Sequence, residues 1–241
     1  MMAEKELQHT ESKRQTRNMF NRIAPSYDRI NTILSFGADR RWRKRFVALA
    51  AERGANRVLD MATGTGEVAV ALAQKQADCH IVGADLSVQM LAGAKEKIER
   101  EHLEGRIELV EADVEQLPFE EGEFDLATVV FGVRNFPDQA RALAELKRTL
   151  RVGGELLVME FSEPKGVLFA PIYRLYQRYW MPWLGGLLSG DRNAYTYLPA
   201  SIRKYCQTVD FEQELRKAGF VLNKTIRLTQ GVATIYCATK R

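Results

Sequence analysis

The sequence predicts an α/β protein in which helices cover both faces of a mostly parallel sheet. Short apolar segments alternate with helical segments between Arg57 and Glu160, a pattern typical of repeated strand–helix units. A glycine-rich loop, Asp60–Gly66, follows the first apolar segment where a strand passes into a helix. The 241 residues give room for one large α/β domain and a short additional segment.

Residues 1–51 are expected to form an N-terminal helical segment ahead of the main domain, residues 52–241. Ala24-Pro25-Ser26 and Ser35-Phe36-Gly37 are breaks in this segment, because proline and glycine interrupt helices. Residues 39–53 have the pattern of a basic amphipathic helix. The segment is therefore expected to consist of helices joined by tight turns.

From Arg57 onward, strands are expected to alternate with helices. The strands are predicted at 57–61, 80–84, 107–110, 124–130 and 155–160, and the helices at 66–76, 87–100 and 137–150. Gly153 and Gly154 are expected to turn the chain into the fifth strand. The aromatic stretch that follows predicts a helical insertion at about 166–205. A helix at 210–218 and two antiparallel strands, 221–228 and 233–239, then complete a sheet of seven strands.

The composition argues against several kinds of site and segment. Three cysteines lie far apart and three histidines are scattered, so neither a disulfide framework nor a metal site is expected. No stretch reaches the roughly 18 apolar residues of a membrane span. The N-terminus lacks the apolar core of a secretory signal. These features predict a cytoplasmic protein.

The net charge of +4 is mild, but basic residues surround Trp42 between Arg40 and Arg45. This cluster has two interpretations. It is either a solvated helix face with Trp42 packed inward, or a patch that faces the phosphates of a lipid or a nucleic acid.

The loop Asp60–Gly66 predicts a site for a nucleotide-like cofactor. Gly64 and Gly66 permit a sharp turn and a close backbone approach to a ligand. In open parallel sheets the ligand crevice lies at the carboxyl ends of the strands. The same residues also match the dinucleotide fingerprint, so an NAD-binding redox protein or nucleotide sensor is an alternative.

Three carboxylates favour a cationic cofactor over NAD. Asp60 precedes the loop, Asp85 ends the second strand and Asp113 follows the third. S-adenosylmethionine (SAM) carries an ammonium and a sulfonium, whereas NAD carries a pyrophosphate that the neighbouring carboxylate of Asp60 would repel. Asp85 is placed to accept hydrogen bonds from both ribose hydroxyls, and Asp113 to accept one from the adenine amino group.

Several motifs resemble those of class I SAM-dependent methyltransferases. They are the loop Asp60–Gly66, Asp85, and the stretch Leu150–Gly154. The usual Lys-Pro before the double glycine is Arg151-Val152 here, which removes a rigid turn residue and keeps the glycines. The resemblance implies a Rossmann-like fold with a seven-stranded, mostly parallel sheet.

A narrower resemblance is to the UbiE/MenG family of ubiquinone and menaquinone biosynthesis C-methyltransferases. It covers the chain from about Thr16 and rests on four separate motifs, namely Tyr27–Trp42, Phe131–Phe136, Arg151–Ser162 and Tyr195–Pro199. Two positions depart from the family pattern. Asp39 stands where histidine is usual, and Val130 stands where some members have a cofactor-contacting serine.

The family resemblance implies roles for individual residues. The implied cofactor contacts are Thr65, Asp85, Asp113 and Val114, which join Asp60, Gly64 and Gly66 of the loop. The implied catalytic residues are Tyr27, Arg134 and Asn135. Residues 1–51 become a substrate cap over the SAM-binding domain.

The implied reaction is C-methylation of a polyprenyl quinol ring, with SAM as methyl donor and without a metal. Demethylmenaquinol is the leading substrate, and the alternative is 2-methoxy-6-polyprenyl-1,4-benzoquinol of ubiquinone biosynthesis, or both. Arg134 is suited to stabilise a phenolate, Asn135 to orient a hydroxyl, and Tyr27 to close the pocket.

An apolar polyprenyl substrate resides in membranes, so the aromatic residues at 167–188 predict peripheral contact with the inner face of the cell membrane. A homodimer is compatible with the sequence, and no nucleic-acid partner is expected. A nucleic-acid methyltransferase would rest on the basic cluster, but the chain lacks an Asn-Pro-Pro-Tyr motif and a Pro-Cys nucleophile.

Overall fold

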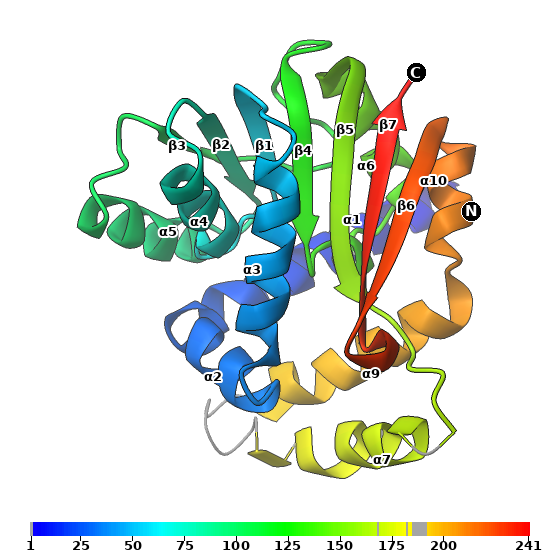
Figure 1. Ribbon diagram of the computed structural model, residues 1–241. Helices are drawn as coiled ribbons and strands as arrows, with labels where there is room; N and C mark the ends of the chain where they lie inside the picture. The colour runs from blue at the N-terminus through cyan, green and yellow to red at the C-terminus, as the bar shows by residue number, and fades with distance from the viewer. Residues whose placement is uncertain (1, 168, 182, 185–191) are drawn as a thin grey trace.

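A seven-stranded sheet forms the centre of the computed structural model (Figure 1), which describes residues 2–167, 169–181, 183–184 and 192–241. The strands are β1 (Arg57–Met61), β2 (His80–Asp85), β3 (Ile107–Glu111), β4 (Phe124–Val130), β5 (Leu150–Phe161), β6 (Phe220–Leu228) and β7 (Ala233–Lys240). Their order is β3-β2-β1-β4-β5-β7-β6. The first five strands are parallel, and β7 runs antiparallel to β5 and β6. The predicted seven-stranded, mostly parallel sheet is confirmed.

Helices cover both faces of the sheet because successive strand residues point to opposite sides. Val58 belongs to a cluster with apolar residues of α3 (Ala38–Ala51), α4 (Glu67–Lys75) and α5 (Val88–Arg100). Its neighbour Leu59 belongs to a second cluster with α6 (Gln139–Thr149) and α10 (Phe211–Lys217). Buried apolar side chains therefore cover both faces of the sheet.

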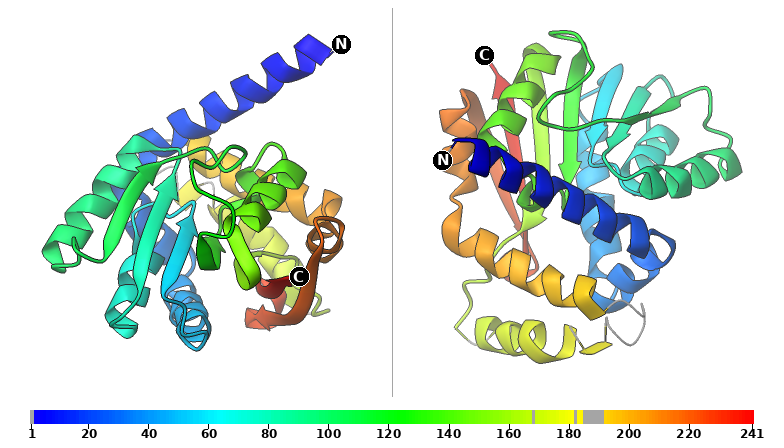
Figure 2. Two further views of the ribbon diagram at one scale, coloured as in Figure 1. Left: turned by 90° about the horizontal axis from the view of Figure 1, so that it is seen from above. Right: turned by 180° about the vertical axis from the view of Figure 1, so that it is seen from behind.

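The N-terminal segment is helical with the two predicted breaks. It comprises α1 (Met2–Ile23), the short 3-10 helix η1 (Ala24–Ser26), α2 (Tyr27–Leu34) and α3. The second break has left-handed backbone at Phe36 and Gly37, with φ of 52° and 73°. Helix α1 runs along the molecule near the carboxyl ends of the parallel strands (Figure 2).

Trp42 of α3 points into the protein, as one of the two interpretations of the basic cluster predicted. Its ring is 6% exposed and packs edge-on against Phe131 and Phe161. Its Nε1 donates to Thr229 Oγ1 at 2.9 Å. Most of the basic side chains around it are exposed, namely those of Arg40, Arg41, Lys44 and Arg45.

Two predicted boundaries are wrong. The fifth strand begins at Leu150 and includes the double glycine, because Leu150 already pairs with Phe124 before the register shifts to Leu126 opposite Glu155. A Cβ on Gly154 would lie 2.8 Å from the Arg151 carbonyl oxygen, so the bulge needs glycine there. Helix α6 begins at Gln139 instead of residue 137, because Asp138 caps it by accepting from the Arg141 amide.

The predicted helical insertion is present over its described part. It contains α7 (Phe169–Leu175), the π-helical turn η3 (Tyr176–Trp180) and α9 (Arg192–Thr208). Residues 168, 182 and 185–191 of the predicted insertion, and the side chain of Tyr195, lie outside the described residues. Figure 1 shows that α7 and α9 lie with α2 beyond the carboxyl ends of the parallel strands.

Candidate active site

A cavity of about 100 Å³ lies at the carboxyl ends of β1, β2 and β4. Four of the residues predicted to contact the cofactor line it, namely Gly64, Asp85, Asp113 and Val114. A hollow of about 40 Å³ beside the glycine loop is lined by Asp60, Gly64 and Thr65. Gly66 lines neither space. It precedes α4 with a φ of 76°, and a Cβ there would lie 3.1 Å from that of Ala94.

Asp60 holds the glycine loop through a hydrogen bond with Thr63. Its carboxylate is 2% exposed and accepts hydrogen bonds from Thr63 Oγ1 at 2.6 Å and Thr128 Oγ1 at 2.7 Å. Burial raises the pKa of Asp60 to about 6, although the two hydroxyls oppose the shift. A buried carboxylate without a cationic partner is energetically unfavourable, so a cation bound next to Asp60 would stabilise its charged form.

Asp85 ties the glycine loop to the end of β2. Its two oxygens accept from the backbone amides of Gly64 and Ser87, both at 2.9 Å. Burial raises the pKa of Asp85, and the backbone amides oppose that shift. Ser87 is the residue that caps α5, since its Oγ accepts from the Met90 amide at 3.2 Å. Asp85 also lines the cofactor cavity.

Helix α1 closes the cofactor cavity from outside, which the sequence did not predict. Lys13 Nζ lies 2.6 Å from carboxylate oxygens of both Asp113 and Glu115, and His9 Nε2 lies 2.6 Å from Glu115. Ligand pockets usually enclose about 300–1,000 Å³, so a nucleoside must displace part of this cover. Lys13 occupies the Asp113 oxygen expected to bind the adenine amino group.

A larger apolar cavity of about 420 Å³ adjoins the first. Its wall is built from α2, α3, α7, α9, the end of β5 and the segment after β4. The apolar side chains that line it are Leu34, Phe36, Trp42, Phe131, Phe161, Phe169, Ile172, Met181 and Leu198. Tyr27 and Phe131 line both cavities. The two spaces therefore meet at these aromatic side chains.

Arg134 lies in the wall of the apolar cavity and is held by a buried ion pair. Its Nη1 donates to Glu160 Oε1 at 2.8 Å, and the two side chains are 3% and 0% exposed. The guanidinium also lies over the Phe161 ring, 5.2 Å from its centroid. Burial disfavours the charged form, but Glu160 outweighs it and the pKa of Arg134 is raised. Glu160 was predicted only as part of a motif, without a role.

The other two predicted catalytic residues lie nearby. Asn135 lines the cofactor cavity, and its Oδ1 accepts from the Tyr197 hydroxyl at 3.1 Å. It does not cap α6, which Asp138 does. Tyr27 packs edge-on against Phe20 with ring centroids 6.0 Å apart, and burial raises the pKa of its phenol. Tyr27 thus lines both cavities, whereas Arg134 lines the apolar cavity and Asn135 the cofactor cavity.

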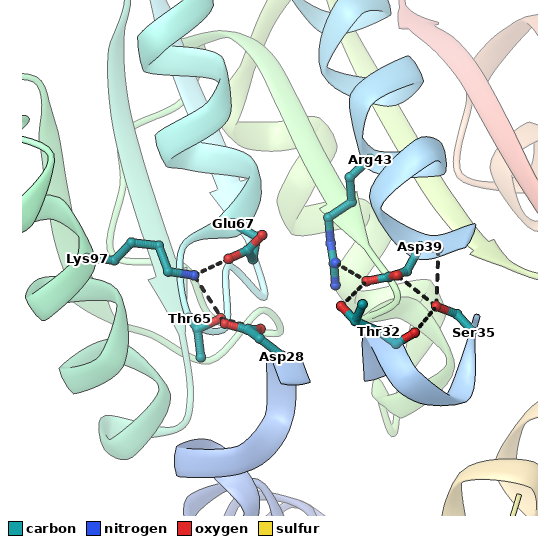
Figure 3. Close-up of polar contacts among 8 residues, drawn as sticks. All are labelled: Asp28, Thr32, Ser35, Asp39, Arg43, Thr65, Glu67 and Lys97. Carbon is teal, nitrogen blue, oxygen red and sulfur yellow. Dashed lines mark hydrogen bonds and ion pairs between the residues drawn. The ribbon is translucent and has the colours of Figure 1, made fainter. Parts of the chain in front are cut away.

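Helix α2 is docked on the glycine loop through a polar link that the sequence did not predict (Figure 3). Thr65 Oγ1 donates to Asp28 at 2.8 Å, and Lys97 Nζ lies 3.1 Å from the same carboxylate. Lys97 also pairs with Glu67. The hydroxyl of Thr65, a predicted cofactor contact, is therefore engaged by Asp28, the neighbour of Tyr27.

Within the described residues, no group of three or more His, Cys, Asp or Glu side chains is arranged to hold a metal ion. None of the described helices combines the length and the hydropathy needed to cross a membrane.

Comparisons with solved structures support the fold. A SAM-dependent methyltransferase from Aquifex aeolicus superposes with a TM-score of 0.56 at 16% identity, over 80% of this chain and 88% of that chain. The [4+2]-cyclase SpnF superposes with a TM-score of 0.64 at 18% identity, over 95% and 96%. Because the second protein carries the name of a cyclase, these likenesses show only the fold.

Sequence comparisons identify the family. The model of the ubiE/COQ5 methyltransferase family matches residues 7–240. A demethylmenaquinone methyltransferase of Thermus thermophilus is 46% identical over 90% of this chain and 98% of its own length. A ubiquinone/menaquinone biosynthesis C-methyltransferase UbiE of Syntrophotalea carbinolica is 44% identical over 92% of each chain. These matches favour the methyltransferase interpretation over the alternative of an NAD-binding protein. The chain belongs to the ubiE/COQ5 methyltransferase family and is a SAM-dependent C-methyltransferase.

Proposed function

We propose that this protein transfers the methyl group of SAM to a ring carbon of demethylmenaquinol. The observation that carries the proposal is the pair of adjoining cavities, which share Tyr27 and Phe131. One is lined by carboxylates suited to a cationic nucleoside, and the other by the apolar side chains that a prenylated ring requires. Relatives from Thermus thermophilus and Deinococcus radiodurans, 46% and 41% identical, are named demethylmenaquinone methyltransferases.

The carboxylates at the strand ends fit SAM. Asp60 is placed for the ammonium of the methionine arm, Asp85 for the ribose hydroxyls, and Asp113 with Val114 for the adenine. Bound SAM supplies an electrophilic methyl group on a positively charged sulfur. The chain holds donor and acceptor in fixed spaces that meet at Tyr27, and such alignment accounts for a large part of a methyl-transfer acceleration.

Arg134 acts on the acceptor side. Loss of a proton from a ring hydroxyl makes the quinol carbon nucleophilic and leaves negative charge on oxygen. A buried guanidinium stabilises that charge more strongly than it would in water. Arg134 does not take the proton itself, because an arginine stays protonated. Its ion pair with Glu160 fixes the guanidinium in the cavity wall. Asn135 orients a hydroxyl, and Tyr27 separates the reacting groups from solvent.

The benzoquinol precursor of ubiquinone is the second candidate acceptor, since relatives of 40–44% identity carry the combined ubiquinone/menaquinone name. Complementation separates the two. The gene is expressed in strains that lack either quinone methylation step, and the lipid extracts are analysed by mass spectrometry. The proposal predicts restored menaquinone. Restored ubiquinone without menaquinone would overturn it.

We also propose that the region around α7 contacts the membrane that holds the substrate. Large apolar side chains are exposed there, namely Phe36, Val167, Ile172, Leu175, Tyr179, Trp180 and Trp183. Arg178 lies over the Tyr179 ring, 5.5 Å from its centroid. Ile172 and Phe36 also line the apolar cavity, so the exposed surface leads into it. Exposed tryptophan and arginine side chains suit a membrane interface.

Liposome co-sedimentation tests the membrane proposal. Trp180→Ser is expected to reduce binding to anionic vesicles at low salt, because an amphipathic aromatic anchor is lost. Val152→Ser is the control, since Val152 is an exposed apolar residue too but lies in the bulge of β5 at the amino-terminal side of the sheet. Equal binding by both variants, or no binding by the unaltered protein, would contradict the proposal.

A further inference from the structure

Arg43 is the only cation in the lining of the hollow beside the glycine loop, among the residues that the structure describes. The same hollow is lined by three carboxylates, Asp28, Asp60 and Glu67. Arg43 also lines the apolar cavity, so its side chain lies at the wall between the two spaces. The Arg43 side chain is 13% exposed.

A buried network fixes the position of Arg43 (Figure 3). Asp39 precedes it by one turn of α3, and its Oδ2 accepts from Arg43 Nη1 at 2.7 Å. Asp39 is 3% exposed and also accepts from Ser35 Oγ at 2.7 Å and Thr32 Oγ1 at 3.2 Å. The hydroxyls hold the carboxylate, and the carboxylate holds the guanidinium. Asp39 therefore acts as a positioning residue for Arg43.

Most of the donors of Arg43 are left for another partner. A guanidinium has five N–H donors, and Asp39 is the only hydrogen-bond acceptor that Arg43 meets within the described part of the chain. A mostly buried cation with unused donors is suited to bind a planar anion such as a carboxylate.

The charges of SAM require such a cation. Its methionine arm ends in an ammonium and a carboxylate, whereas the predicted cofactor contacts comprise only carboxylates and uncharged groups. Lys97 already neutralises Asp28 and Glu67 at the edge of the hollow. Asp60 is left to face the ammonium. A carboxylate placed beside Asp60 without a cation would be strongly disfavoured in this partly buried space.

We propose that Arg43, held in place by Asp39, binds the α-carboxylate of the methionine arm of SAM. The inference rests on the use of SAM by this chain and is independent of which quinol is methylated. It also gives Asp39 a role. Aspartate stands where the resembled family usually has histidine, and here its negative charge orients the arginine one helical turn later.

Two other cations line the cofactor cavity and are less suited. Lys13 is already paired with Asp113 and Glu115. Arg17 lines the cofactor cavity but not the hollow beside Asp60. Arg17 thus becomes the competing residue in the experiment.

The test compares two ligands by isothermal titration calorimetry on the full chain. S-adenosylhomocysteine retains the carboxylate, whereas 5′-methylthioadenosine lacks the whole amino-acid arm. Arg43→Met is expected to weaken binding of S-adenosylhomocysteine about 10- to 100-fold and to leave binding of 5′-methylthioadenosine within about twofold. Retained binding of the second ligand shows that the fold and the adenosine site are intact.

Further variants complete the test. Arg43→Lys and Asp39→Asn are expected to show intermediate losses for S-adenosylhomocysteine only, and Arg45→Met on the exposed face of α3 is expected to show none. Equal losses for both ligands in Arg43→Met and Arg43→Lys would overturn the proposal. So would a loss specific to S-adenosylhomocysteine in Arg17→Met with none in Arg43→Met. The titrations contain no quinol, so their outcome is separate from that of the proposed acceptor.

Discussion

Glu160→Gln is predicted to destabilise the protein and to slow methyl transfer. Glu160 lies near the end of β5 and is the partner of Arg134 in the wall of the acceptor cavity. Its carboxylate accepts from Arg134 Nη1 at 2.8 Å, from the Arg134 amide at 3.2 Å and from the Phe161 amide at 2.8 Å. Glutamine keeps the size of the side chain but removes the charge that balances the guanidinium.

The burial of the Arg134–Glu160 pair determines how much stability the Glu160→Gln change removes. With side-chain exposures of 3% for Arg134 and 0% for Glu160, removal of one partner leaves a buried charge unbalanced, which costs about 3–5 kcal/mol. Most proteins have only about 5–15 kcal/mol of stability. For a protein of this size the loss corresponds to a fall in Tm of roughly 6–20 °C.

Urea unfolding followed by circular dichroism measures the effect, with Glu155→Gln as the matched control. Glu155 is on the same strand and pairs with Arg53 at 3.2 Å, but its side chain is 28% exposed. A pair this open to solvent contributes about 0–1 kcal/mol. If Glu160→Gln costs no more than Glu155→Gln, the reasoning from burial is refuted. The double change Arg134→Met with Glu160→Met is expected to recover stability without activity.

Four further predictions concern ligand binding, turnover and stability. Arg134→Ala is expected to lower kcat by about 10²- to 10³-fold with little change in the Kd for SAM, and equal losses in both would refute its acceptor-side role. SAM affinity is expected to fall as the pH drops below about 6, because the raised pKa of Asp60 then leaves it protonated and neutral; titrations at pH 5 to 8 that show constant affinity would contradict this. The same shift means that Asp60 favours folding when protonated, and this contribution is lost as the pH rises through about 6. Lys13→Met is expected to speed SAM association in stopped-flow measurements by freeing Asp113, and an unchanged or slower rate would show that α1 does not obstruct entry.

Local patterns predicted most elements of the fold. Strands β1, β4 and β7 and helix α3 lie within two residues of their predicted bounds, because apolar periodicity and Gly or Pro breaks are encoded in neighbouring residues. The start of β5 was missed since it depends on pairing with Phe124, which is distant in the sequence. Pairing of that kind leaves no local signal.

The site was predicted unevenly for the same reason. Asp60, Asp85 and Asp113 were found because each follows a strand. Lys13 was missed because one lysine in a charged N-terminal helix gives no sign of the carboxylate it meets 100 residues away.

Arg43 was hidden in a run of basic residues. Only the fold shows that Arg43 pairs with Asp39 and lines the hollow beside the glycine loop, while its neighbours Lys44 and Arg45 are exposed to solvent.

One measurement tests the central claim most directly. The purified protein is incubated with SAM carrying a deuterated methyl group and with chemically reduced demethylmenaquinone in detergent, and the extracted quinones are analysed by mass spectrometry. Because the proposed SAM and quinol cavities adjoin, we expect menaquinone that carries the labelled methyl group on a ring carbon. The Arg134→Ala variant is expected to lose this product. Unlabelled quinone after incubation with a protein that binds SAM, or a label on oxygen, would contradict the assignment.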